Sequence, residues 1–223
     1  MLYNPKIEYV KFGKVTNEQT GERFYETPDG NLASVTTILG TTGDKSGLQA
    51  WRDWVGEEKA NKESKEATGL GTLMHEHLEK YVMGEERPRG NNVVRQMARN
   101  MADTIIGRGL INVNEVWAIE QELWYPGLYA GTADLVILHN KALAIGDYKT
   151  TKKPKKEEWV LDYKLQSVAY ALAHNEVYGT DFRKGIIFMV SRAYEYQEWI
   201  VEGNEFEDLT SVWLSRLETF YSK

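Results

Sequence analysis

One segment in the middle of the chain restricts the fold more than any other, because it predicts a β-hairpin with a charged open end. Residues 131–139 and 142–149 are two largely apolar runs, and Asn140-Lys141 stands between them. A two-residue turn of this kind requires positive φ angles, which asparagine tolerates. The sequence therefore predicts two antiparallel strands joined by a tight turn.

Charged residues are expected to meet at the open end of this hairpin. Partners across such a turn have position numbers with a constant sum, and the pairs on one face are then Leu138–Leu143, Val136–Ile145 and Asp134–Asp147. Facing Cβ atoms lie about 4.5–5.5 Å apart, so two facing carboxylates repel each other unless positive charge lies between them. Lys149 follows on the same face, roughly 6.6 Å beyond Asp147. Together these residues predict a divalent-metal site for phosphate chemistry, although either aspartate alone would be an ordinary turn cap.

The residue types in the chain limit what could bind there. The chain has no cysteine, which excludes disulfides, thiolate zinc sites and iron–sulfur clusters with cysteine ligands. Carboxylate oxygens favour Mg²⁺, and we expect Mn²⁺ to substitute for it. The N-terminus lacks the basic-then-apolar pattern of a secretory signal, and no apolar run approaches the ~18 residues of a membrane span. We therefore expect a cytoplasmic protein with no membrane partner.

Size and charge are consistent with a single soluble domain. The chain has 223 residues, of which 42% are hydrophobic and 27% are charged. The net charge of −6 is not that of a typical nucleic-acid binder. A run of lysines nevertheless follows the candidate metal site and comprises Lys152, Lys153, Lys155 and Lys156. Such runs are usually solvated surface, but this position favours contact with a phosphate backbone.

Periodicity and turn residues predict further elements around the hairpin. We expect strands within residues 5–33, a helix from Val35 that Ser34 caps and Gly40 ends, helices at 48–65, 70–82 and 92–107, strands at 115–124, 129–139 and 142–149, a helix at 157–178, strands at 184–191 and 196–201, and a last helix at 206–221. From residue 70 onward this order is that of one α/β or α+β domain with a mixed sheet.

Two histidines lie on the helix predicted at 70–82. His77 falls inside its apolar arc and is expected in the core with a local hydrogen bond. His75 lies at the edge of the arc, one turn after Gly71, whose missing side chain leaves space beside it. An imidazole at this edge could reach a cleft while its helix packs on the sheet, so His75 is a candidate metal ligand.

Other polar side chains could join the site from neighbouring elements. Gln166 and Tyr170 are four residues apart and project together from the long helix, although a partly exposed helix face explains this pattern more simply. Glu120 could approach the aspartates from the preceding strand, and a surface role explains it equally well. On that strand Ile119 and Leu123 are expected to share the opposite face.

In this order, the residues resemble the motifs of the PD-(D/E)XK nuclease superfamily. The matching motifs are Gly71-x-x-x-His75, Gly131-Thr-Ala-Asp134, Asp147-Tyr-Lys149 and Gln166-x-x-x-Tyr170. The helix histidine and the Gln-x-x-x-Tyr pair are similar to the RecB-type branch. Within that branch the chain most resembles the mitochondrial genome maintenance exonuclease group and related phage exonucleases, and the likeness extends from Ser34 to the end of the chain.

The resemblance implies a fold and a set of metal ligands. The fold would be a restriction-endonuclease-like core, with a mixed central sheet flanked by helices and an N-terminal strand and helix elaboration. His75, Asp134 and Asp147 would bind the metal together with the backbone carbonyl of Tyr148. Glu120 would help with a second metal or a water. The host would be a bacterial cell or a phage-infected one.

It also implies roles for residues that do not hold the metal. Lys149 would orient or activate the attacking water and stabilise charge on the phosphate. Gln166 would position Lys149 or DNA, and Tyr170 would shape the pocket. Asp147 occupies a position where many relatives carry Glu, which is a permitted variant.

The segment before the core could handle the substrate. As regions of one domain we expect N-terminal strands at 1–33, a helical arch within 34–68 and the nuclease core at 70–223. The arch would occupy residues 41–68, and a single strand could thread beneath it while Trp51 and Trp54 stack on bases. An ordinary packed helix pair with core tryptophans is an equal alternative. Thr150 and the four lysines would add further DNA contacts.

The sequence thus favours a metal-dependent DNA exonuclease that prefers single strands with a free end. The alternatives are a double-strand-resecting exonuclease, a flap or structure-specific endonuclease on the same core, and a catalytically silent DNA-binding module. Neither cleavage polarity nor a protein partner follows from these residues.

Overall fold

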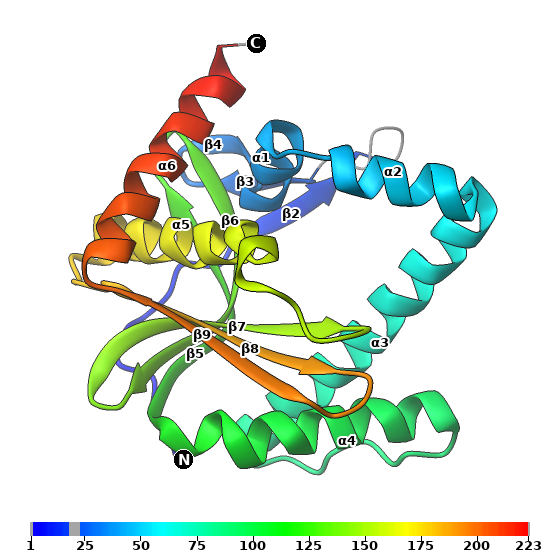
Figure 1. Cartoon of the computed structure of the whole chain (residues 1–223). Coiled ribbons are helices and arrows are strands. Elements are labelled where there is room, and N and C mark those ends of the chain that lie inside the picture. The colour runs from blue at the N-terminus through cyan, green and yellow to red at the C-terminus, as the bar shows by residue number, and fades with distance from the viewer. Residues whose placement is uncertain (1, 18–22, 223) are drawn as a thin grey trace.

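A six-stranded mixed sheet runs through the centre of the computed structural model, which describes residues 2–17 and 23–222 (Figure 1). Its strands, in spatial order, are β1 (Leu2–Tyr3), β5 (Val113–Tyr125), β6 (Tyr129–His139), β7 (Ala142–Thr151), β8 (Lys184–Ser191) and β9 (Tyr196–Glu202). The β1–β5 and β7–β8 pairs are parallel, and the other pairs are antiparallel. The expected mixed α/β class is confirmed, and the arrangement is consistent with a restriction-endonuclease-like core.

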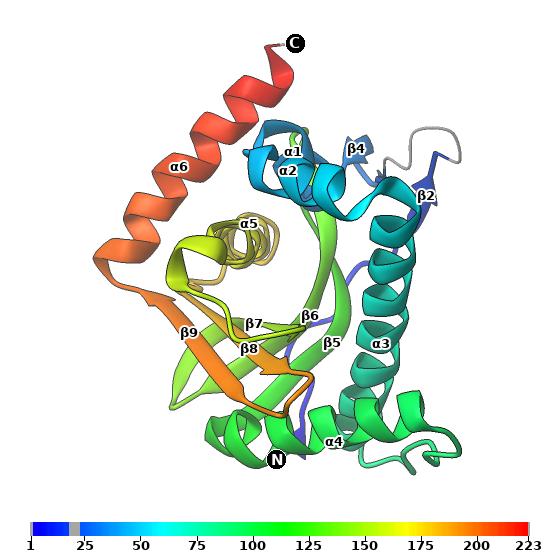
Figure 2. The ribbon, with the colours of Figure 1, turned by 45° about the vertical axis from the view of Figure 1, so that its right-hand side comes forward.

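Helices cover both faces of this sheet (Figure 2). They are α1 (Val35–Thr42), α2 (Ser46–Val55), α3 (Glu57–Met83), α4 (Val93–Arg108), α5 (Leu161–Tyr178) and α6 (Asn204–Tyr221). Residues of α1, α5 and α6 form one apolar core with Val136 and Ile145 of the sheet. Residues of α3 and α4 form a second core with Leu135 and Ile137 on the opposite face. None of the described helices combines the length and apolar character that crossing a bilayer would require.

The β6–β7 hairpin has the predicted turn and register. Asn140 and Lys141 both have positive φ, at 48° and 67°, as a two-residue turn requires. The ladder pairs Leu138 with Leu143 and Val136 with Ile145, as expected, and ends at Leu135 and Gly146. Asp134 and Asp147 lie one step beyond this last pair, and there the two strands no longer form ladder hydrogen bonds.

A small second sheet precedes the core. It contains β2 (Gly13–Thr16), β3 (Arg23–Thr27) and β4 (Gly30–Ala33), all antiparallel. The Ser34 side chain accepts a hydrogen bond from the Thr37 amide and so caps α1 as predicted. The helix then continues through Gly40 to Thr42, because Ile38 and Leu39 are buried in the core and outweigh the glycine. Residues 18–22 of the expected N-terminal meander lie outside the described part of the chain.

The helices expected at 48–65 and 70–82 have different bounds in the structure. The break lies at Gly56, whose φ is 86°, and α3 continues unbroken through Gly69 and Gly71. We call α2 with residues 57–69 of α3 the arm. The arm stands away from the sheet in both views (Figures 1 and 2). Among residues 46–69 only Ala60 is buried and Trp54 is 83% exposed, so the alternative of a packed pair with core tryptophans is wrong.

Two other expectations need correction. The helix expected from residue 157 begins at Leu161, after a short 3-10 turn (Glu157–Trp159) that ends at Val160. This helix, α5, lies between the sheet and α6. On the face that carries Gln166 and Tyr170, Gln166 is partly exposed as expected, whereas Tyr170 is buried. Ile119 and Leu123 do not share a face, because they pack in opposite cores.

Candidate active site

The site forms where the β6–β7 hairpin opens. Beyond the last ladder pair, the Asp134 carboxylate enters the gap between the strands, where its Oδ2 accepts a hydrogen bond of 2.7 Å from the Tyr148 amide. β7 meanwhile keeps its parallel pairing with β8 as far as Thr151. The side chain of Asp134 thus replaces a backbone partner, and this fixes its position at the strand end.

His75 reaches this gap from α3. Its Nε2 lies 3.0 Å from the carbonyl oxygen of Tyr148, which can only accept, so Nε2 carries the proton. This bond turns Nδ1 toward two carboxylates, at 3.6 Å from Glu120 Oε1 and 3.8 Å from Asp134 Oδ2. A histidine whose second nitrogen is held by a carbonyl is well oriented to act as a metal ligand.

Glu120 joins the site through an unusual backbone conformation. Its φ is 46° in the middle of β5, a region that non-glycine residues adopt only at a cost of about 1–3 kcal/mol. The distortion interrupts the alternation of the strand, which explains why Ile119 and Leu123 enter opposite cores. Backbone strain of this kind concentrates at functional sites.

The three side chains have the geometry of a cation site. Ligand atoms of His75, Glu120 and Asp134 all lie within 4.8 Å of one another. Ligands of one Mg²⁺ or Mn²⁺ ion, with bonds near 2.1 Å, lie at most about 4.2 Å apart. A small closure therefore brings all three onto one ion, and a donor set of two carboxylates and one imidazole fits such a metal.

The electrostatic field at this point is negative. Burial lowers the pKa of His75, but the Asp134 carboxylate and the hydrogen bond and charge of Glu120 raise it more, to about 9. The same field attracts a divalent cation, which must compete with the proton on Nδ1.

Asp147 and Lys149 form an ion pair beside this cluster. The Lys149 Nζ lies 2.6 Å from Asp147 Oδ1 and 2.5 Å from Oδ2. Asp147 is buried, which raises its pKa, and the ammonium of Lys149 counters that shift. Desolvation also disfavours the charged Lys149, but Asp147 outweighs it and raises the pKa of the lysine. Asp147 thus pairs with Lys149, and the ligand atoms that lie within 4.8 Å of one another belong to His75, Glu120 and Asp134.

Glu79 is a site residue that the sequence analysis missed. It lies one turn after His75 on α3, and the two side chains line one cavity together with Glu120. We call this cavity the cleft. Burial and the nearby Glu120 carboxylate raise the pKa of Glu79, so this side chain faces the negative cluster. The i, i+4 spacing from His75 was the sequence signal that could have identified it.

Gln166 and Tyr170 border the other side of the cluster. The Gln166 Nε2 donates to the Tyr170 hydroxyl at 3.2 Å, and both residues line a cavity of about 160 Å³ with Asp134 and His75. Gly131 makes room for this tyrosine, because a Cβ there would lie 2.5 Å from the Tyr170 ring. At Gly71 a Cβ would make only ordinary contact with Thr150, so the space expected beside it is not essential.

The cleft is a larger cavity, of about 1020 Å³, and opens over the cluster. Its lining includes His75, Glu120, Lys149, Thr150 and further residues of α3. A neighbouring cavity of about 350 Å³ is lined by Trp51, Lys152 and Lys155, together with Thr150 again. The other residues expected at the nucleic-acid surface do not line either cavity. They are Lys153, Lys156 and Trp54, which are exposed.

The other three histidines are buried and do not line the cavities of the site. His77 is in the core as expected, but its Nδ1 has no hydrogen-bond partner within the described residues. His174 is fully buried, with one ring nitrogen 3.0 Å from the Tyr9 hydroxyl and the other 2.7 Å from Thr180. His139 is also fully buried.

Comparison with known proteins gives only distant similarities. No protein-family model matches the chain, and no curated protein matches it. Among solved structures, an alkaline exonuclease from Laribacter hongkongensis is 11% identical over 84% of this chain and 88% of its own, with a TM-score of 0.31. A Vibrio cholerae protein, VC1899, is 14% identical over 80% of this chain and 59% of its own, with a TM-score of 0.24.

Proposed function

We propose that this protein is a metal-dependent deoxyribonuclease that degrades single-stranded DNA from a free end. One observation carries the proposal: His75, Glu120 and Asp134 converge within 4.8 Å beside the Asp147–Lys149 ion pair. The motifs that suggested a nuclease in the sequence lie far apart along the chain, yet their residues line two adjoining cavities. Lys149 lines the larger one, Asp134, Gln166 and Tyr170 line the smaller one, and His75 lines both.

The chemistry of phosphodiester hydrolysis matches these groups. A divalent cation held by His75, Glu120 and Asp134 would supply positive charge against the developing charge of the phosphate. Lys149 adds a second positive charge, and its ion pair with Asp147 fixes the ammonium before substrate arrives. The hydrogen bond from Gln166 to Tyr170 holds the amide at the wall of the smaller cavity, beside Asp134 and His75, where it can position the scissile strand.

The preference for single strands rests on the arm. Almost all of its side chains are exposed or partly exposed, and Trp51 lines the cavity next to the cleft. We therefore propose that the arm forms most of the arch expected at residues 41–68, and that this arch admits one flexible strand and excludes a duplex. The exposed side chains of Trp54, Lys153 and Lys156 would add weaker contacts with the strand.

Cleavage assays with linear and circular DNA test this proposal. The protein is incubated with an end-labelled single-stranded oligonucleotide or its circular counterpart, in Mg²⁺, Mn²⁺ or EDTA. We expect shortening of the linear strand only, in either metal and not in EDTA. Cutting of the circle would instead indicate an endonuclease, and equal degradation of blunt duplex would indicate a resecting enzyme.

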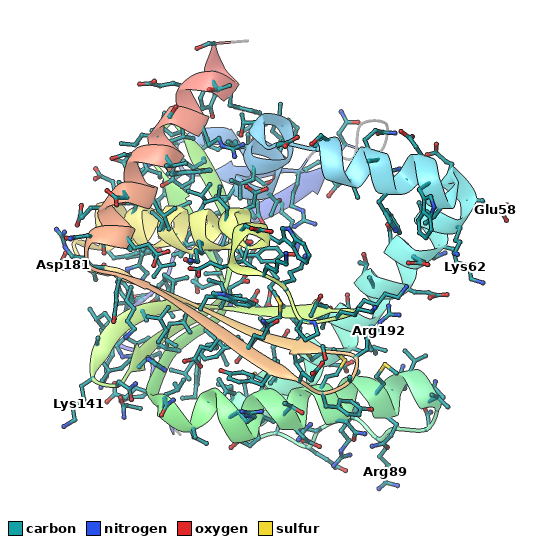
Figure 3. The ribbon with its side chains drawn as sticks, in the orientation of Figure 1. Glu58, Lys62, Arg89, Lys141, Asp181 and Arg192 are labelled. Atoms are coloured by element: carbon teal, nitrogen blue, oxygen red, sulfur yellow. The ribbon has the colours of Figure 1, made fainter. Side chains whose placement is uncertain are left out.

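Asp134→Asn tests the site itself. The amide still accepts the hydrogen bond from Tyr148 but carries no charge for a cation, so we expect activity to fall at least about 100-fold. Asp181→Asn is the matched control, because Asp181 is an exposed aspartate at the far edge of the molecule (Figure 3). Calorimetric titration with Mn²⁺ should show binding to the control and not to Asp134→Asn. DNA binding without cleavage in any metal would favour a silent binding module.

A further inference from the structure

A second cavity lies beside the active-site cleft and has the size of a ligand pocket. Its volume is about 350 Å³, and it shares Ala67 and Thr150 with the wall of the cleft. Ligand pockets in proteins typically have volumes of about 300–1,000 Å³. The shared residues make the two cavities neighbours along one groove, so a chain molecule in the cleft can continue into the second cavity.

Two aromatic rings line this cavity from different elements. Trp51 comes from α2 in the arm, and Tyr163 comes from the first turn of α5 in the body. The Nζ atoms of Lys149 and Lys155 lie 5.2 and 5.8 Å from the centre of the Tyr163 ring, so this ring also links the cavity to the catalytic lysine. Aromatic side chains of this kind stack on nucleobases of any sequence.

Lys155 is a half-buried cation that has no carboxylate partner among the described residues. Within the described residues, the more deeply buried lysines all have one: Lys149 pairs with Asp147, Lys164 with Glu157 and Glu205, and Lys184 with Glu202. The ammonium of Lys155 contacts the Tyr163 ring, and burial lowers its pKa with no opposing charge from the described part of the chain. Gln197 nevertheless holds its backbone with two hydrogen bonds, of 2.7 and 2.8 Å. The lysine is thus kept at a place where an anion would stabilise it.

Arg192 is the second uncompensated cation of the cavity. Its backbone amide donates to the Thr151 carbonyl at 3.0 Å, but its guanidinium has no hydrogen bond or ion pair to any described residue. Figure 3 shows Arg192 at the end of the sheet that lies toward α3. The cavity also contains Lys152, whose charge Glu63 offsets at 3.2 Å. Two positive charges therefore remain available for a phosphate.

We propose that this cavity is a nucleotide subsite, which binds one base of the substrate strand against Trp51 and Tyr163 and its phosphate on Lys155 and Arg192. The inference rests on the proposed nuclease function and adds how the strand is held next to the point of cleavage. Occupation of the subsite fixes the register of the strand, so it sets the shortest oligonucleotide that is degraded efficiently.

Binding measured without cleavage tests the subsite separately from the activity. Fluorescein-labelled oligo(dT) of several lengths is titrated with the full chain in EDTA, and anisotropy gives the affinity. Trp51→Ala should weaken binding about 5- to 100-fold, the range typical for loss of one stacking platform. Lys155→Gln and Arg192→Gln should each weaken binding and reduce its salt dependence by about one ion.

Matched variants separate these effects from general loss of charge or aromatic surface. Arg89→Gln removes the same charge as Arg192→Gln from an exposed loop that points away from the cleft (Figure 3). Trp159→Ala removes an exposed tryptophan that lines neither cavity. Both should bind like the parent protein. Photo-cross-linking with 5-iododeoxyuridine at successive positions should give Trp51 or Tyr163 adducts at one fixed position in the strand.

Each result supports or overturns the subsite. Parent-like affinity of Trp51→Ala, Lys155→Gln and Arg192→Gln, or cross-links spread evenly along the strand, would overturn it even if the protein cleaves DNA. Loss of binding in these variants would support it even if no metal produces cleavage, in which case only the nuclease proposal fails. If free dTMP displaces the oligonucleotide at micromolar concentration, the cavity is a mononucleotide site and the strand proposal is wrong.

In the active enzyme the subsite also predicts a specific kinetic change. Arg192→Gln should raise KM for oligo(dT) in Mn²⁺ with little change in kcat, because the residue holds the strand and not the reacting phosphate. An equal fall in kcat would place Arg192 in the chemistry and contradict a role limited to the subsite.

Discussion

The floor of the cleft and the arm above it are built in opposite ways. The floor consists of the β6–β7 hairpin and the second half of α3, where Leu70, Met74 and Leu78 are buried in the core. The arm contains only one buried residue, although it includes the first half of the same helix. One continuous helix thus passes from solvent into the core, and His75 lies on its packed half.

The difference indicates a division of work. Metal ligands must be held within a few tenths of an ångström, which packed elements can do and an exposed helix cannot. A segment that admits and releases a strand benefits from few packing contacts, because its movement then disturbs little of the core. Four sets of variants test this contrast, and they follow in order of decreasing effect on stability.

Lys149→Met should have the largest effect on the floor of the cleft. It leaves Asp147 buried without its counter-charge, and we expect the free energy of unfolding to fall by about 3–5 kcal/mol. Urea denaturation of Lys149→Met and of Asp147→Asn/Lys149→Met measures this effect, since the double variant removes both charges and should recover much of the loss. Equal stability of both variants would mean that the ion pair is not a structural element of the floor.

His174 should make the stability of the packed core, and not that of the arm, sensitive to acid. Burial lowers its pKa from 6.5 to about 4, so between these values the unfolded chain binds the proton and the folded chain does not. Stability is complete above pH 6.5 and falls as the pH drops, by up to roughly 3 kcal/mol near pH 4. The difference between the pH–stability curves of the parent and His174→Gln isolates this contribution. Parallel curves would contradict it.

Substitutions at two glycines, one in the floor of the cleft and one in the arm, compare these regions directly. In Gly131→Ala the new Cβ would lie 2.5 Å from the buried Tyr170 ring, so we expect a loss of about 1–3 kcal/mol and slower cleavage. In Gly69→Ala, on the exposed half of α3, nothing lies within 4 Å of the new Cβ, and helix propensity should add up to about 1 kcal/mol. Thermal unfolding of both variants measures whether each substitution lowers or raises the stability. Destabilisation by Gly69→Ala would show that this part of α3 is more tightly packed.

Trp54→Ala should have the smallest effect on stability. The side chain is 83% exposed, so we expect a change within about 0.5 kcal/mol. Any loss of affinity for single-stranded DNA in EDTA then reports a direct contact and not a folding defect. A shift of several degrees in the unfolding midpoint would mean that the arm packs more closely than its exposure indicates.

Local patterns in the sequence are sufficient to predict the hairpin and the mixed α/β class. The turn at Asn140-Lys141 and the pairing of Val136 with Ile145 follow from local rules, namely positive φ at the turn and the two-residue period of a strand. The strands at Tyr129–His139 and Lys184–Ser191 begin and end where the apolar runs do, for the same reason.

Which polar groups face one another depends on the tertiary structure. Glu120 turns toward His75 through a strained backbone angle that no sequence period indicates. Asp147 forms an ion pair with Lys149, because a buried carboxylate is stabilised most by the charge nearest to it. Glu79 lines the cleft, and Arg192 and Tyr163 line the neighbouring cavity. Their positions depend on packing between distant segments, whereas strand and helix periods are local properties of the chain.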